Sequence, residues 1–495
     1  MNPKIIQGGM GVGVSTWSLA QAVSKFGQLG VVSGTALDQL MIRRLADGDP
    51  DGAMRRGLDA FPFTDMARRI WQEYFVPGGK PREVPYPATP MHQLRDPRKV
   101  VELCIVSNFL EVFLAKEGHD NPVGINFLEK VQTVHLPSIY GAMLAGVGYV
   151  LMGAGIPLHI PGVLDLFAHP AGPQDAEYKL SVTGAPADMD TVMRFDPADY
   201  AEGPLPVLAR PRFLAIVSSN TLATTMLRRA NGRVDGLILE TQIAGGHNAP
   251  PRGKLQLSVI GEPVYGQRDQ VNIEDLRALG VPIWLAGGYG SPEKLREALD
   301  LGAAGIQVGT AFEFADESGL RADFKQRLLA LARTENATVF TDPQASPTGF
   351  PFKVARLAGT SSEPEIYSQR PRLCNLGFLR EAYVAPDSRI AYRCAAEPVN
   401  AYVAKGGKLE DTIGRKCLCN ALMANVGYAQ LLPGQASESA AETQFEPALI
   451  TAGDDLSTVA RFLPQGRTHY TAADVLHSLL SLSAEPAPVQ ETVNA

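Results

Sequence analysis

The sequence lacks the features that mark a membrane, secreted or nucleic-acid-binding protein. No stretch of about 18 uncharged apolar residues occurs in the 495 residues, so a membrane span is not expected. No run of lysine and arginine occurs and the net charge is −7, which argues against a nucleic-acid partner. The first residues, MNPKIIQGGMG, contain no basic segment followed by a long apolar one, so no secretory signal is expected.

Cysteine is scarce, with 5 residues in the chain, which excludes a disulfide scaffold and favours a reducing, cytoplasmic location. Most of them nevertheless fall in one segment, at Cys374, Cys394, Cys417 and Cys419. Four thiolates could bind zinc or an iron–sulfur cluster, but the usual C-x2-C pairs are missing. Because cysteine also packs well as a buried thiol, we assign no metal site here and leave the question open.

Two nucleotide-binding patterns are also missing. After Gly9 and Gly11 a dinucleotide fingerprint would need glycine or alanine at position 14, where the chain has Val14. The phosphate-loop pattern, in which lysine follows glycine, does not occur either. A Rossmann domain and a phosphate-loop ATPase are therefore not expected.

What the chain does contain is a series of short apolar runs separated by helical stretches. Runs of four to six apolar residues that do not alternate with polar ones are typical of strands buried on both faces of a parallel sheet. With helices between them, they predict a (β/α)8 TIM barrel of the α/β class, with an open doubly wound sheet as the alternative. The runs are Lys4–Gln7, Leu29–Ser33, Pro122–Asn126, Gly148–Met152, Phe213–Val217, Gly236–Leu239, Pro282–Ala286 and Gly305–Val308.

The spacing of the runs predicts a barrel with additions. Residues 35–121 form a long insertion after the second strand and include a helical pattern at 63–75. We expect the barrel domain to span residues 1–330 and a mostly helical extension, bearing the cysteine segment, to span 331–495. A second excursion follows the sixth run at 241–280.

Within the extension, a helix is predicted at 471–481, where Thr471 and Asp474 can form a capping box. A linker is expected at 433–442, in the sequence PGQASESAAE.

Glycine-rich turns follow the seventh and eighth runs, where a barrel of this kind usually binds phosphate. The first turn contains Gly287 and Gly288, and the second begins with Gly309 and Thr310. Glycine lets backbone N–H groups approach a ligand closely, and convergent N–H groups can hold an anion. Because active sites lie at the carboxyl ends of barrel strands, the two turns predict a phosphate site, although glycine also serves simply to form tight turns.

A single histidine stands out in LETQIAGGHNAPPRG, residues 239–253. The sixth run ends at Glu240, and the chain then turns through Gly245 and Gly246 before presenting His247. An isolated histidine in a loop is usually solvated or structural. This one lies at the same end of the barrel as the phosphate turns, and imidazole can exchange a proton near neutral pH. We therefore predict that His247 is catalytic.

Several of these segments together resemble the nitronate monooxygenase family, formerly called 2-nitropropane dioxygenases. That family includes the FMN-dependent enoyl reductases of bacterial fatty-acid synthesis. The resemblance covers roughly residues 3–320 and implies a TIM barrel that binds FMN without covalent attachment. The segments that carry it are IIQGGMG, VGIN, GLILETQIAGGH, IWLAGGYGSPEKLREALDLGAAGIQVGTAF and ADES.

The resemblance also implies a role for individual residues. His247 matches the histidine near the flavin that serves as acid/base, although Ala249 replaces the glycine that the family usually has two residues later. It implies that Gly9 and Met10 lie along the flavin ring and that Asn126 hydrogen-bonds the cofactor. It implies that the phosphate is held by Gly287, Gly288, Gly309 and Thr310, with Gln307 nearby.

From these patterns and the resemblance we expect an FMN-dependent oxidoreductase that oxidises alkyl nitronates with O2. The alternatives are an NAD(P)H-dependent enoyl reductase on the same flavin barrel and a non-catalytic FMN-binding module. The expected partner is a small-molecule substrate of nitronate or enoyl type, with no nucleic acid and no membrane. Whether the chain forms a homo-oligomer stays open.

Overall fold

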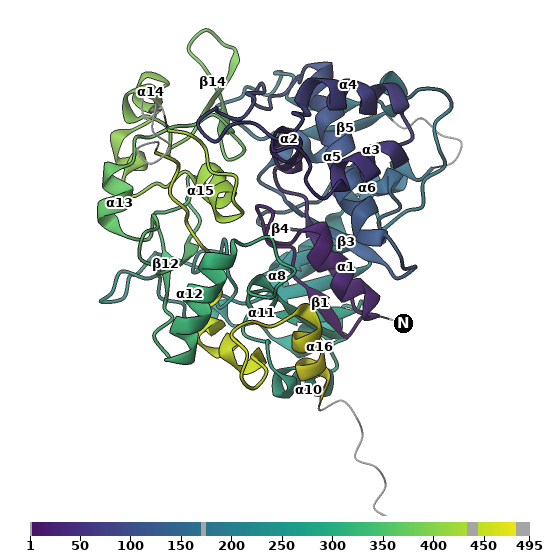
Figure 1. Ribbon diagram of the computed structural model, residues 1–495. Coiled ribbons are helices and arrows are strands. Elements are labelled where there is room, and N and C mark those ends of the chain that lie inside the picture. The colour runs from purple at the N-terminus through teal and green to yellow at the C-terminus, as the bar shows by residue number, and fades with distance from the viewer. Residues whose placement is uncertain (1, 170–174, 433–443, 482–495) are drawn as a thin grey trace, which may run out of the picture.

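The computed structural model describes residues 2–169, 175–432 and 444–481 (Figure 1). Its centre is an 8-stranded parallel sheet in the order β1-β11-β10-β9-β8-β4-β3-β2. A parallel bridge between Ile6 of β1 and Leu29 beside β2 brings the two edge strands together, so the sheet closes into a barrel. The predicted (β/α)8 barrel is thereby confirmed. The linker expected at 433–442 lies outside the described residues.

Each of the predicted apolar runs forms one barrel strand, with ends that lie within two residues of the prediction. The strands are β1 (Ile5–Gln7), β2 (Gly30–Ser33), β3 (Val123–Leu128), β4 (Tyr149–Gly153), β8 (Arg212–Val217), β9 (Gly236–Glu240), β10 (Ile283–Ala286) and β11 (Gly305–Val308).

Helices surround the barrel and fill the insertion after β2. They are α1 (Trp17–Lys25), α2 (Leu37–Ala46), α3 (Ala53–Ala60), α4 (Thr64–Tyr74), α5 (Arg98–Lys116), α6 (His135–Leu144), α7 (Ile160–Phe167), α8 (Asn220–Arg229), α9 (Ile273–Arg277), α10 (Pro292–Asp300) and α11 (Thr310–Glu313). The helix predicted at 63–75 is confirmed as α4. Short 3-10 helices and strands lie in the loops at η1 (Gln132–Val134), β5 (Ala176–Lys179), β6 (Val182–Thr183), β7 (Val192–Phe195), η2 (Pro197–Asp199) and η3 (Gln267–Asp269).

The region after the barrel strands contains both helices and strands. Its elements are α12 (Ala322–Arg333), β12 (Val339–Asp342), β13 (Phe352–Ala355), α13 (Pro364–Gln369), β14 (Glu381–Val384), β15 (Ile390–Arg393), α14 (Val399–Ala404), η4 (Leu409–Thr412), α15 (Leu418–Asn425), η5 (Asp454–Phe462) and α16 (Ala472–Leu480). One of its strands pairs with the connection between α7 and β8, since Ala382 of β14 pairs with Val182 of β6.

The last helix, α16, completes the ring of helices around the barrel. It packs against both α1 and α10, which is the place of the helix that follows the eighth strand (Figure 1). The predicted capping box starts it, because the Thr471 hydroxyl accepts from the Asp474 N–H and the Asp474 carboxylate accepts from the Thr471 N–H. The predicted division of the chain at residue 330 stays a prediction.

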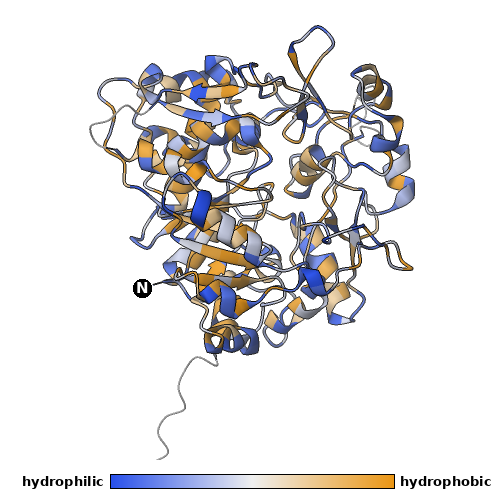
Figure 2. Ribbon diagram, turned by 180° about the vertical axis from the view of Figure 1, so that it is seen from behind, coloured by the Kyte–Doolittle hydropathy of each residue, from blue (hydrophilic) through white to orange (hydrophobic). Residues whose placement is uncertain are grey.

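The barrel interior is packed with apolar side chains up to its carboxyl end. Ile6, Leu151, Ile238 and Trp284 belong to one buried cluster, separate from the larger cluster beneath the helices. Figure 2 shows the barrel strands coloured largely as hydrophobic. Because side chains alternate along a strand, the next inward position after Ile238 on β9 is Glu240. The interior therefore turns polar at its carboxyl end, where the candidate site lies.

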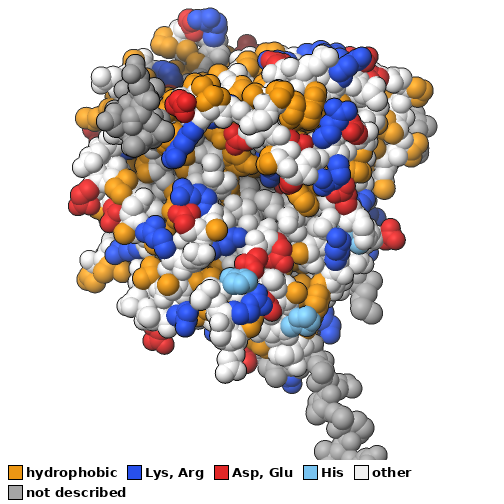
Figure 3. All heavy atoms as spheres, in the orientation of Figure 1, with side chains coloured by type: hydrophobic (Ala, Val, Ile, Leu, Met, Phe, Trp, Pro, Cys, Tyr) orange, Lys and Arg blue, Asp and Glu red, His pale blue; other side chains and the backbone are white. Residues whose placement is uncertain are grey.

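The surface carries charges of both signs. Figure 3 shows acidic and basic side chains interspersed over the face seen in Figure 1. Among the helices in the described ranges, none combines the length and apolarity needed to cross a membrane.

Candidate active site

A cavity opens at the carboxyl ends of the barrel strands. It encloses about 1550 Å³ free of protein atoms, counted out to its mouth. Every residue that was predicted to be catalytic or to contact the cofactor lines it: Gly9, Met10, Asn126, His247, Gly287, Gly288, Gln307, Gly309 and Thr310. The structure thus brings together residues from five separate strand-to-helix loops and strand ends, and their individual roles stay predictions.

The floor of the cavity carries two buried oxygen atoms without partners. Asn126, within β3, donates an Nδ2 hydrogen to the carbonyl oxygen of Gly9 over 3.0 Å. Its Oδ1 atom is buried and has no hydrogen-bond partner among the described residues, and the same is true of Oε1 of Gln307 on β11. Unpaired buried acceptors are costly, so they indicate a ligand that donates hydrogen bonds here.

The turn after β1 can only be made by glycine. A Cβ atom at Gly9 would lie 2.3 Å from Cβ of Asn126, which leaves no space for a side chain. The close approach brings the Gly9 carbonyl within reach of Asn126, so the backbone beside Met10 forms part of the cavity wall.

The turn after β10 has a backbone conformation that favours glycine. Gly287 and Gly288 have φ values of +82° and +77°, a region that side chains disfavour. A Cβ atom at Gly287 would also lie 2.4 Å from the Thr241 hydroxyl. The two glycines are therefore required by backbone conformation, whether or not an anion binds beside them.

The turn after β11 contacts the extension as well as the cavity. The Thr310 hydroxyl accepts a hydrogen bond from the Gly453 N–H over 3.0 Å. The Asp455 carboxyl also hydrogen-bonds Thr310, and its burial raises its pKa. A carboxyl in the neutral form can donate a hydrogen bond, so Asp455 is compatible with an anion nearby.

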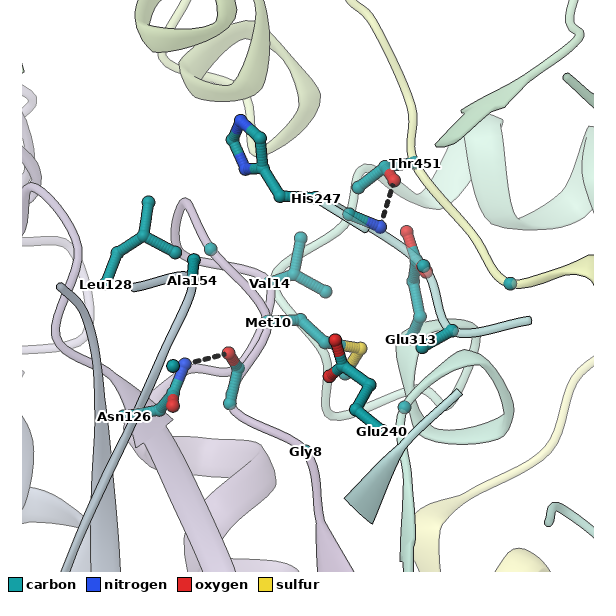
Figure 4. A pocket seen from close by; sticks show the side chains of 18 of the residues that line it. Gly8, Met10, Val14, Asn126, Leu128, Ala154, Glu240, His247, Glu313 and Thr451 are labelled. Carbon is teal, nitrogen blue, oxygen red and sulfur yellow. Dashed lines mark hydrogen bonds between the residues drawn. The ribbon is translucent and has the colours of Figure 1, made fainter. Parts of the chain in front are cut away.

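His247 lies on the opposite side of the cavity from the floor, in a loop that is fastened to the extension. Its Nε2 atom is 2.7 Å from the hydroxyl oxygen of the buried Ser346, and its ring meets Phe352 edge to face at 4.9 Å. The loop is held further by the Gly246 N–H, which donates to the Thr451 hydroxyl (Figure 4). In Figure 4 the imidazole points away from Met10 and the cavity floor.

Burial also sets the charge of His247. Removal from water, with the positive charge of Lys130 nearby, lowers the pKa of His247 to about 4. The imidazole is therefore neutral at pH 7 and can accept a proton there. Its low pKa makes it a weak base.

Two glutamates in the cavity were given no role from the sequence. Glu240, the last residue of β9, extends into the cavity in Figure 4, and burial raises its pKa to about 7. Glu313, at the end of α11, is 3% exposed, and burial together with the charge of Asp455 raises its pKa well above the ordinary value. Alternation along β9 could have identified Glu240, since Ile238 two residues earlier is a core position.

The roof of the cavity comes from the extension, and no sequence signal predicted it. This roof is formed by the lining residues Phe352, Phe378, Leu379, Leu418, Cys419, Leu422, Thr451, Ala452, Gly453 and Asp455. Most of these side chains are apolar, whereas the floor is formed by the polar ends of the barrel strands. The roof therefore shapes the apolar part of the cavity.

The cysteine segment adjoins this roof and contributes Cys419 to it. Cys394 and Cys417 are buried in one small cluster, with Cys374 and Cys419 packed against it, and all are free thiols. In the part of the chain that the structure describes, no group of three or more histidine, cysteine or acidic side chains is arranged to hold a metal ion.

Comparison with known proteins identifies one matching segment. Residues 202–348 match the family model described as nitronate monooxygenase. The chain is 33% identical over 132 residues to a protein of Bacillus subtilis (strain 168) named "Probable nitronate monooxygenase", which covers 26% of this chain and 36% of that protein. It is 29% identical over 143 residues to the nitronate monooxygenase of Pseudomonas aeruginosa PAO1, which covers 28% and 38% respectively. The matches thus span little more than a third of these curated relatives.

A solved structure of FabK from Thermotoga maritima is 15% identical in sequence, with a TM-score of 0.47, and the match covers 97% of this chain and 92% of that one. The sequence matches agree with the resemblance seen above: residues 202–348 are similar to the nitronate monooxygenase family.

Proposed function

We propose that the protein is an FMN-dependent oxidoreductase of the nitronate monooxygenase type, which oxidises alkyl nitronates with O2. The observation that carries this proposal is the meeting of the predicted residues in one cavity whose floor has two unpaired acceptors, on Asn126 and Gln307. The ring system of FMN has an N–H donor and several carbonyl acceptors, so it can pair with amide side chains of this kind.

In this proposal the floor and the glycine turns hold the cofactor. Gly9 and Met10 would lie along the flavin ring, and Asn126 and Gln307 would hydrogen-bond it. The phosphate would bind at the turns after β10 and β11, through Gly287, Gly288, Gly309 and Thr310. When bound, FMN supplies the electron transfer from substrate to oxygen. The protein supplies binding, orientation and exclusion of water.

His247 is proposed to exchange a proton with the substrate. Because its imidazole is neutral at pH 7, it can accept a proton from the acidic carbon of a neutral nitroalkane. Its contact with Ser346 would hold the ring in place. A merely bracing role is the alternative, and the two are separated by comparing His247→Ala with Ser346→Ala on neutral nitroalkanes and on preformed nitronates. A base predicts a selective loss on neutral substrates in His247→Ala, whereas a brace predicts equal losses on both.

One observation favours a second function. The roof covers part of the cavity from above, as expected if the barrel holds FMN as a binding module without turnover. The enoyl reductase alternative shares the same cofactor residues. The cytoplasmic location and the absence of a nucleic-acid partner stay predictions.

The test begins with the flavin. The purified protein, reconstituted with FMN if needed, is mixed without oxygen with a nitronate or with NAD(P)H, and the flavin absorbance is followed. Bleaching by the nitronate, with nitronate-dependent oxygen uptake in air, is the expected result. Bleaching by NAD(P)H alone would favour the enoyl reductase, and bleaching by neither would favour the binding module. A protein that binds no FMN would overturn the proposal.

A further inference from the structure

The cavity floor contains one carboxyl group that neither the cofactor contacts nor the proposed role of His247 uses. Glu240 is the last residue of β9 and follows the core residue Ile238 by two positions, so its side chain faces the barrel axis. Figure 4 shows it extending from the strand into the cavity beside Met10. No ion pair within the described residues holds its carboxylate, so nothing in that part of the chain neutralises its charge.

We propose that Glu240, and not His247, is the base that takes the proton from the α-carbon of a neutral nitroalkane, which leaves His247 the bracing role named above as its alternative. The proposal rests on the proposed function and deepens it. In this step the carbon–hydrogen bond breaks, an oxygen–hydrogen bond forms on the Glu240 carboxylate, and the electron pair moves onto the nitro group to give the nitronate. The proton later passes from Glu240 to solvent, which restores the carboxylate.

The position of Glu240 suits this step better than the position of His247 does. The imidazole is turned toward Ser346 and the extension, away from the floor on which the flavin contacts converge. Glu240 lines the same cavity as Asn126 and Gln307, the residues proposed to hold the flavin ring, and it is in register with Gln307 through Ala286 of β10. A substrate between the flavin and the roof would therefore meet the carboxyl group at the floor.

The ionisation of Glu240 agrees with the geometry. Burial raises the pKa of its carboxyl to about 7, close to the value at which a general base works best near neutral pH. The other titratable groups that line the cavity are Glu313 on α11, Asp455 on η5, Cys419 on α15, Tyr289 after β10 and His247 itself. Burial raises the pKa of Glu313 and Asp455 as well, and it lowers that of His247 to about 4. Of Glu240 and His247, it is therefore the glutamate that titrates near pH 7.

Cofactor binding should report on Glu240 without any turnover. Placing FMN over the floor removes water from Glu240, which disfavours the carboxylate further and raises its pKa. Binding of FMN at a pH just above 7 should therefore take up a fraction of a proton. Calorimetry in buffers of different ionisation enthalpy measures this uptake directly.

The test compares wild type with Glu240→Gln and the matched control Glu313→Gln. We expect proton uptake in wild type and in the control, and none in Glu240→Gln, although all three bind FMN. At pH 8, Glu240→Gln should lower kcat/KM for a neutral nitroalkane by about 100-fold, within the usual range for a general base, and for the preformed nitronate by less than about fivefold.

A measurement on the protein alone keeps this proposal separate from the proposed function. Infrared titration of the cofactor-free protein should reveal a carboxyl that ionises between about pH 6 and 8 and disappears in Glu240→Gln. Absence of that signal, unchanged proton uptake in the variant, or equal losses on both substrates would overturn the role of Glu240. A titrating carboxyl in a protein that binds no FMN would instead overturn the proposed function.

Discussion

The floor and the roof of the cavity are built by different parts of the chain and in different ways. The floor consists of barrel strand ends, packed on apolar side chains such as Ile238 and Trp284 that are almost fully buried. The roof consists of segments that come after the barrel strands in the chain, fastened to the barrel loops by hydrogen bonds such as those at Thr451 and Thr310. The floor holds unpaired polar atoms, whereas the roof offers mainly apolar surface.

This difference suggests that the floor and the roof have different functions. A floor fixed by the barrel is suited to hold a cofactor that requires defined hydrogen bonds, because the strands leave little freedom to Asn126 and Gln307. A roof contributed by the extension is suited to determine which apolar groups of a substrate fit above it. Changes in the floor should therefore affect cofactor binding, and changes in the roof should affect substrate selectivity.

The largest effect is expected at the floor, from Gly309→Leu. The φ of Gly309 is −105°, which any residue can adopt, and a Cβ there would lie 3.5 Å from Sδ of Met10. The added side chain would fill space proposed for the phosphate, so we expect the Kd for FMN to rise about 100-fold, as for the loss of roughly two hydrogen bonds. Fluorescence titration with FMN measures the change.

The control for this variant is Gly266→Leu. Gly266 has a φ of −121° and no atom near its Cβ position, so it tolerates the same substitution away from the cavity. Gly288 is a poorer choice, because its φ of +77° would strain any side chain. Equal FMN affinity in both leucine variants would contradict the assignment of the floor to the cofactor.

The floor was largely predictable from the sequence, and the roof was not. Strands buried on both faces appear as apolar runs, so the residues that follow each run, including Asn126 and Gly309, could be located from the pattern. The inward-facing position of Glu240 could also have been predicted, since the inward positions of β9 follow from alternation. Phe352 and Phe378 belong to segments without a clear period, and their place above the barrel depends on contacts that no local pattern encodes.

The second effect concerns how the roof is anchored to the insertion after β2. The carbonyl oxygen of His92 accepts a hydrogen bond from Arg380, which is two residues from Phe378 of the roof. Although burial alone would disfavour the charged ring, hydrogen bonds to Asp38 and Asp96 raise the pKa of His92 to about 9. The buried imidazolium therefore links Asp38 and Asp96 to each other, and the backbone of the same residue binds Arg380 beside the roof.

Because the folded pKa of His92 lies above its ordinary value of 6.5, its stabilising contribution is complete below about pH 6.5 and is lost as the pH rises through 9. We expect a loss of about 3 kcal/mol in the free energy of unfolding over that window. Denaturant unfolding at several pH values measures it, and His92→Gln should flatten this dependence. The exposed His469→Gln serves as control, and an unchanged slope in His92→Gln would contradict the role of the imidazolium.

The third effect is expected at the roof itself, from Phe378→Ala. The side chain is 7% exposed and lines the cavity, so its truncation removes apolar surface above the substrate. Loss of such burial is worth about 1.5 to 3 kcal/mol, which predicts a KM for the nitronate raised at least about tenfold. The Kd for FMN should change less than about threefold. A larger loss in FMN affinity than in KM would contradict the proposed division between floor and roof.

The smallest effect concerns the thiols of the cysteine segment and tests how tightly that part of the molecule is packed. A hydrogen bond from the Cys394 thiol lowers the pKa of Cys374, which is half-buried, whereas burial raises the pKa of Cys417 and of Cys419. Since the thiolate is the nucleophile, iodoacetamide at neutral pH should label Cys374 several times faster than the others. Mass spectrometry of digested samples over time gives the rates, and the buried Cys104 of α5 serves as the slow reference.

FMN binding at the floor should leave the rate at Cys374 unchanged. Uniform labelling of all the cysteines would mean that the roof opens as a unit. That result would contradict the description of the roof as a packed part of the molecule above a fixed floor.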